Sequence, residues 1–182
     1  MNPLITKLKS VVVRGVIRAI NDEAARQMCT VTLLAGETKD RIERLQQFGF
    51  SSNCPSGASA VFVAVGADRA RLVCIGENHP DYRPTGKKEG ETIVYDAFDQ
   101  FIHLQKSGVI EINAAGELLI KAPIKVRIET TRLEVTGDIV DNVDTDGQSM
   151  ADMRETYNIH KHPENDSGGP TDEPNEQMGG AS

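Results

Sequence analysis

Residues 91–143 read "ETIVYDAFDQFIHLQKSGVIEINAAGELLIKAPIKVRIETTRLEVTGDIVDNV" and indicate the architecture of the chain. Apolar and charged residues alternate most clearly in "IKVRIE", where Ile124, Val126 and Ile128 would share one face of a strand. Strand-like runs follow one another with almost no connecting residues, at 92–98, 100–105, 108–114, 116–123, 124–131 and 132–140. This pattern favours a β-solenoid or an intertwined β-prism over a compact sandwich with long connections.

A β-helix built from this stretch of one chain would have a thin core and exposed strand edges, which favour aggregation. Several chains that wind around one another would pair those edges and share the apolar interior. We therefore expect a homotrimer.

The N-terminal half of the sequence carries a different β pattern. Five β-rich runs, separated by turn-forming residues, occupy about sixty residues: "RGVIRAI", "CTVTLLA", "RIERLQQF", "ASAVFVAVG" and "ARLVCIG". Five short strands at this spacing predict a small barrel, for which the OB-fold is the expected solution. Residues 1–13 are expected to form a short amphipathic helix, and residues 81–90 a linker.

Composition excludes several classes of protein. Of the 182 residues, only 38% are hydrophobic and 4% aromatic, so one large globular core is not expected. The net charge of −7, with no basic stripe, argues against nucleic-acid binding. No run has the length of a membrane-spanning helix. Cys29, Cys54 and Cys74 have no metal-ligand spacing and are interpreted as reduced core thiols.

Two of the four histidines, His160 and His162, form a His-x-His motif before a polar C-terminal tail. In an extended chain, residues i and i+2 lie on the same face, so both imidazoles can bind one ion. Around a threefold axis, three copies supply six nitrogens. This number suits an octahedral ion such as ferrous iron better than tetrahedral zinc. The alternative is that the two histidines occur together by chance in a polar, solvated tail and bind no metal. The other histidines, His79 and His103, are expected to be structural or solvent-facing rather than ligands.

The segment "VTGDIVDNVDTDGQSMADMRETYNIHKHPENDSGGPTDEPNEQM", residues 135–178, resembles the spike tip of contractile phage tails. The family is that of baseplate assembly protein V and the Mu-type baseplate spike proteins. "AGETKDRIERLQQFGFSSNCPSG", "GADRARLV" and "DYRPTGKKEGE" are similar to the barrel and linker of the Mu-type proteins.

The resemblance implies a trimeric needle: an all-β protein with an OB-fold collar at 14–80, a linker at 81–90, a triple-stranded β-helix shaft at 91–148 and an apex at 149–182. It also implies one iron ion per trimer, bound by the motif that maps onto His160 and His162. Some members of the family hold calcium and chloride ions as well. Asp141, Asp144 and Asp146 could supply oxygen ligands by composition, but a polar turn with Asp as turn former is the favoured interpretation.

The implied function is mechanical rather than enzymatic. The collar would attach to the tail hub and baseplate proteins, and sheath contraction would drive the apex through the host outer membrane. Such a protein would be assembled in the host cytoplasm and located in the virion. The sequence has no GxSxG motif and no P-loop. One alternative is a β-helical metalloenzyme acting on host-surface polysaccharide, with Glu164 or Asp166 as a third ligand. The other is an OB-fold module that binds nucleic acid.

Overall fold

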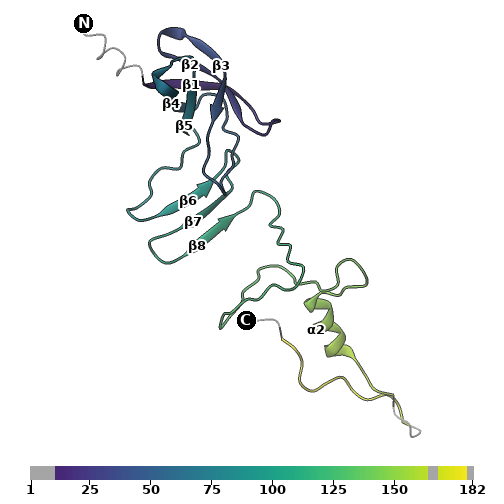
Figure 1. The fold of residues 1–182 in the computed structure, drawn as a ribbon. Helices are drawn as coiled ribbons and strands as arrows, with labels where there is room; N and C mark the ends of the chain where they lie inside the picture. Colours follow the sequence, from purple (N-terminus) through teal and green to yellow (C-terminus); the bar gives the residue numbers. More distant parts are fainter. Residues whose placement is uncertain (1–10, 164–167, 180–182) are drawn as a thin grey trace. The chain divides into compact units, whose positions relative to one another are not determined.

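The computed structural model describes residues 11–163 and 168–179 (Figure 1). The expected N-terminal helix lies almost wholly outside the described residues, and the first strand already begins at Val12. The chain divides into two compact units, Met1–Ile120 and Lys121–Ser182. The first unit contains a barrel and a small sheet, and the second contains one helix.

The five strands expected in the N-terminal half are confirmed, and they form a closed barrel in the order β1-β2-β3-β5-β4. All neighbouring pairs are antiparallel except β3 and β5, which run parallel. Short 3-10 turns follow β2 and β4, at Leu34–Gly36 and Val65–Ala67. The strands are β1 (Val12–Asn21), β2 (Met28–Leu33), β3 (Thr38–Arg44), β4 (Ser59–Ala64) and β5 (Leu72–Asn78).

Alternate residues of these strands fill the barrel. The largest fully buried side chains are Phe62, Ile17, Val31, Cys29 and Cys74. The interpretation of the cysteines as core thiols is confirmed. All three are free: Cys29 and Cys74 lie in the core, and Cys54 packs against it, partly buried. A hydrogen bond with Cys74, together with burial, raises the pKa of the Cys29 thiol. The thiol therefore stays protonated, as an inert core residue does.

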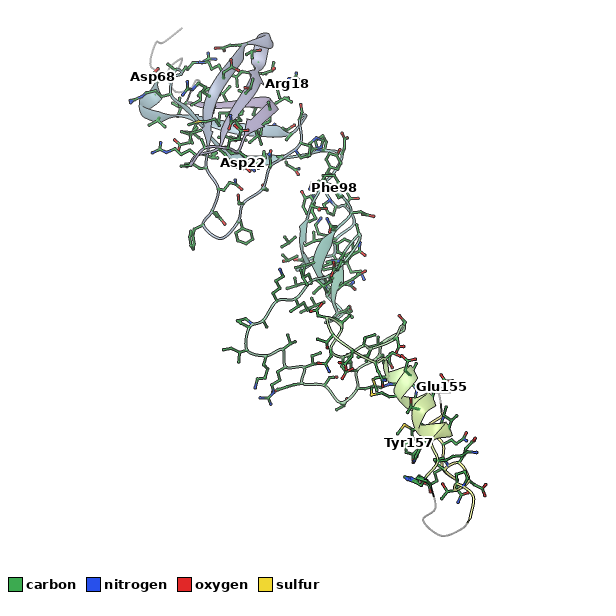
Figure 2. The ribbon with its side chains drawn as sticks, turned by 90° about the vertical axis from the view of Figure 1, so that its right-hand side faces the viewer. Arg18, Asp22, Asp68, Phe98, Glu155 and Tyr157 are labelled. Atoms are coloured by element: carbon green, nitrogen blue, oxygen red, sulfur yellow. The ribbon has the colours of Figure 1, made fainter. Side chains whose placement is uncertain are left out.

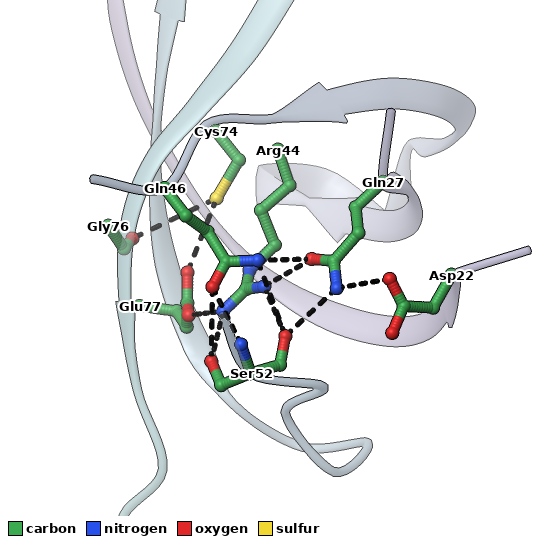
Figure 3. A network of polar contacts seen from close by, with 8 residues as sticks. All are labelled: Asp22, Gln27, Arg44, Gln46, Ser52, Cys74, Gly76 and Glu77. Carbon is green, nitrogen blue, oxygen red and sulfur yellow. Dashed lines mark hydrogen bonds and ion pairs between the residues drawn. The ribbon is translucent and has the colours of Figure 1, made fainter. Parts of the chain in front are cut away.

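A buried arginine fixes the loop after β3 to the barrel (Figure 3). The Arg44 guanidinium forms an ion pair with Glu77 on β5 and donates to the Ser52 carbonyl at 2.7 Å. It also donates to the side chain of Gln27. Burial alone would lower the pKa of Arg44, but the hydrogen bond and charge of Glu77 outweigh it and raise the pKa. Arg44 is thus a charged strut that connects two strands and a loop.

The small sheet consists of β6 (Thr92–Tyr95), β7 (Phe101–Leu104) and β8 (Ile110–Asn113), all antiparallel (Figure 1). The Glu91 carboxylate precedes β6 and accepts backbone hydrogen bonds from Lys106 at 3.1 Å and Lys88 at 2.8 Å. These bonds hold the pKa of Glu91 below its ordinary value. The carboxylate therefore connects the start of the sheet to its β7–β8 turn.

Beyond β8, the chain departs from the strand pattern that its sequence indicates. Residues 116–139 form no strand with any described part of the same chain, although three strands are expected there. The chain is paired again only at an isolated bridge between Val140 and Ser149. The fold is mostly β, as expected, but it also contains the helix α2 (Met150–Ile159), which the expected all-β apex did not include.

Candidate metal centre

The histidine pair begins where α2 ends. Ser149 caps the helix: its hydroxyl oxygen accepts from the Asp152 amide at 3.0 Å, and the Asp152 carboxylate accepts from the Ser149 amide at 3.2 Å. This reciprocal capping box satisfies two otherwise unpaired amides and places a negative charge at the positive end of the helix dipole. Ser149 and Asp152 are the sequence signal that would have predicted α2. Ile159 is the last helical residue, and His160 takes an extended conformation at φ −67° and ψ 145°.

One nitrogen of His160 is already engaged. Its Nδ1 lies 2.5 Å from the carbonyl oxygen of Tyr157. Tyr157 lies in the last turn of α2 (Figure 2). A carbonyl only accepts hydrogen bonds, so Nδ1 is the donor, and in the neutral ring the lone pair is on Nε2. Ligand histidines in metal sites have this arrangement, with one nitrogen donating to a carbonyl and the other facing the metal.

The structure brings the second histidine to the same place. The ring centroids of His160 and His162 are 5.1 Å apart, with the rings nearly perpendicular at 87°. The residue between them, Lys161, is exposed and pairs with Glu173 at 3.8 Å.

A single chain supplies only two such donors. Among residues 11–163 and 168–179, no group of three or more His, Cys, Asp or Glu side chains could hold a metal ion. Glu164 and Asp166, the carboxylates of the enzyme alternative, lie outside the described residues. Among the described residues, the donor set of one chain consists of these two imidazoles, which suits iron, nickel or copper only if further ligands come from elsewhere.

Asp141, Asp144 and Asp146 occupy a turn between the Val140–Ser149 bridge partners. The Asp141 carboxylate accepts from the Gln148 amide at 3.3 Å, and the Thr145 amide donates to the Asn142 carbonyl at 2.9 Å. Asn142 has a positive φ of 44°, which turns favour in Asn and Asp. These contacts account for a polar turn.

Of the two remaining histidines, His79 has the structural role expected of it. His79 is buried, with Nε2 3.1 Å from the Ser56 carbonyl, while Nδ1 accepts from the Asp81 amide at 3.2 Å. His103, on β7, has Nε2 3.5 Å from the Glu91 carboxylate. The Nε2 of His103 makes no hydrogen bond among the described residues, and both histidines lie far in sequence from the His-x-His motif.

One part of this site has no signal in the sequence. The C-terminal tail folds back and bonds to the histidine segment, with the His162 amide donating to the Thr171 hydroxyl at 2.9 Å. No sequence pattern predicts this contact, because it joins two polar segments that have no hydrophobic periodicity.

Comparison with known proteins places the chain in a family. The family model described as bacteriophage Mu Gp45, N-terminal, matches residues 14–81, which contain nearly all of the barrel. The baseplate puncturing device gp45 of Escherichia phage Mu is 31% identical over 139 residues, covering 76% of this chain and 70% of that protein. The chain belongs to the Mu Gp45 family. A second member, the Mu-like prophage FluMu protein gp45 of Haemophilus influenzae, is 29% identical over 89% of this chain and 91% of its own length.

The resemblance to Mu-type baseplate spike proteins is therefore confirmed. The match to the phage Mu protein extends well beyond the barrel that the Mu Gp45 family model covers. Within the described residues, no helix combines the length and apolar character needed to cross a membrane.

Proposed function

We propose that this protein is the central spike of a contractile phage-type tail baseplate. The observation that carries the proposal is the similarity of this chain to a protein named as a baseplate puncturing device. In this role the spike attaches to the tail hub, resides in the virion, and is driven through the host outer membrane on sheath contraction. The work is mechanical, so the protein needs no catalytic residues and is not an enzyme.

An intertwined homotrimer is supported by an apolar sheet face that lacks a cover within the described chain. The strand register places Val94, Ile102 and Ile112 in one row across β6, β7 and β8. Leu104 and Ile110 form a parallel row on the same face. All five side chains are between 42% and 65% exposed. Apolar residues so arranged mark a contact surface, and the proposed partners are two further copies of the chain.

The segment after β8 supports the same assembly. Ile124, Val126 and Ile128 are 93%, 57% and 62% exposed, although their alternation is that of a half-buried strand. Strands from neighbouring chains would bury these side chains and supply the hydrogen-bond partners that most of residues 116–139 lack among the described residues.

The closed order β1-β2-β3-β5-β4 supports an OB-fold collar at residues 14–80. The collar is followed in the proposal by the linker at 81–90, a β-helical shaft at 91–148 and an apex at 149–182. The helix α2 then belongs to the apex, next to the histidine pair.

At the apex, three copies of His160 and His162 would hold one iron ion through six imidazole nitrogens. The free Nε2 of His160 and the 5.1 Å separation of the two ring centroids support this assignment. A metal that binds only the assembled trimer stabilises it by mass action and fixes a tip that has little core of its own. Calcium and chloride sites remain predictions of the family resemblance.

The test is the metal content of the purified protein, measured by elemental mass spectrometry, with the particle mass measured by light scattering. One iron per three chains in a trimeric particle is the expected result. The double variant His160→Ala/His162→Ala should remain trimeric and lose the iron, while His79→Ala should retain it. Iron retained in the double variant would refute the assignment of the site, and a monomeric wild-type particle would refute the spike.

A further inference from the structure

Two sets of hydrogen bonds connect the C-terminal tail to α2 and to the histidine segment that follows it. We define the C-terminal strap as residues 171–178. At its start, the Thr171 hydroxyl accepts from the His162 amide at 2.9 Å, and the Thr171 amide donates to the His162 carbonyl at 2.9 Å. At its end, Met178 exchanges two backbone hydrogen bonds with the Asn158 side chain, at 3.1 Å and 2.8 Å.

These contacts hold the backbone of His162 on both sides of its side chain. Both the amide and the carbonyl of His162 are bonded to one residue, Thr171, which restricts φ and ψ together. Asn158 lies on α2, so its clasp to Met178 fastens the far end of the strap to the same helix that presents His160. The Lys161–Glu173 ion pair adds a third contact between the two segments.

The two histidines are thus oriented by different means. His160 is oriented from the helix side, through the hydrogen bond to the Tyr157 carbonyl. His162 is exposed and lies beyond the end of the helix, where α2 provides it with no further hydrogen bond among the described residues. Its backbone is held by the strap.

We propose that the C-terminal strap is a positioning device for the metal centre, with Thr171 as the residue that orients His162. This inference rests on the proposed metal site. A ligand held in its binding conformation loses less conformational entropy when the metal binds. Removing a group that orients a metal ligand typically lowers the metal affinity 10- to 100-fold.

The test uses the full-length protein and Co²⁺ as the probe, because the d–d absorption of Co²⁺ reports its coordination. Thr171→Val keeps the shape of the side chain and removes the acceptor for the His162 amide. Thr171→Ser keeps the hydroxyl. Gln177→Ala is the matched control, since Gln177 lies in the strap and makes no side-chain hydrogen bond within the described residues. Co²⁺ affinity is measured by competition with a chelator, and the particle mass by light scattering.

Thr171→Val should bind Co²⁺ about 10- to 100-fold more weakly than wild type, with an unchanged particle mass and an altered d–d spectrum. Thr171→Ser should restore wild-type affinity, and Gln177→Ala should match wild type. If wild type binds Co²⁺ at one ion per three chains and Thr171→Val binds it equally tightly, the strap proposal is wrong and the metal site stands. If wild type binds no Co²⁺, the metal site itself is wrong, and the strap proposal with it.

Discussion

Replacing Ile102 with glutamate should prevent assembly of the spike. Ile102 is the central residue of the row Val94–Ile102–Ile112 on the exposed sheet face, and it is 42% exposed in the single chain. Complete burial of an isoleucine contributes about 1.5–3 kcal/mol. The part still exposed is therefore worth about 1 kcal/mol per chain, or about 3 kcal/mol in a trimer.

A carboxylate at this position has a larger effect than the loss of the isoleucine. An unpaired charge buried in protein costs several kcal/mol even after local relaxation. Three such charges brought together would cost on the order of 10 kcal/mol, which lowers the association constant by about 10⁷-fold. The trimer should dissociate at micromolar concentration.

The assay is sedimentation velocity over a range of concentrations, with far-UV circular dichroism to follow the barrel. Ser107→Glu is the matched control, because Ser107 is exposed in the turn between β7 and β8 and receives the same charge. The control should remain trimeric, and the barrel signal should persist in both variants. A trimeric Ile102→Glu protein with wild-type thermal stability would show that this face is not the interface.

Three further predictions concern stability. Glu77→Gln leaves the buried Arg44 guanidinium without its counter-charge, so it should destabilise the barrel by about 3–5 kcal/mol in urea unfolding; an unchanged midpoint would contradict the strut. The lowered pKa of Glu91 means that its carboxylate stabilises the small sheet fully above pH 4.5 and loses this effect as the pH falls through the lowered pKa. Hydrogen exchange near the β7–β8 turn should therefore accelerate in acid, and Glu91→Gln should remove that pH dependence. Gly15→Ala would place a methyl group 2.7 Å from a carbonyl oxygen of β2, so the thermal midpoint should fall by an amount equivalent to about 1–3 kcal/mol; a wild-type midpoint would contradict this close contact.

The barrel could be predicted from sequence because its signal is local. Runs such as "ASAVFVAVG" alternate apolar and small residues over the length of one strand, and turn residues separate them. Their pairing follows from the need to bury one face of each strand, as Phe62 and Val31 show. The parallel contact between β3 and β5 has no such local signal, since it depends on how the whole sheet closes.

The candidate site was predicted only in part for the same reason. The histidine spacing fixes which residues can act together, and the structure places the rings 5.1 Å apart. The helix before them was not predicted. Its signal is the capping pair Ser149 and Asp152, which has no β periodicity. The return of the strap to His162 depends on hydrogen bonds between polar segments, which hydrophobic pattern does not encode.

The helix itself provides an independent argument for self-association. A helix of ten residues is marginal in water, and α2 has no buried residue within the described chain. Its capping box and the Asn158 clasp hold its two ends, but neither explains the apolar residues Met150, Met153 and Tyr157. These residues are spaced at i, i+3 and i+7, so they form one stripe along the helix, and each is about 40% exposed. In a trimer, three such stripes that face one axis would bury one another and bring the three histidine pairs that follow them close together. Assembly and metal binding would then stabilise the same tip.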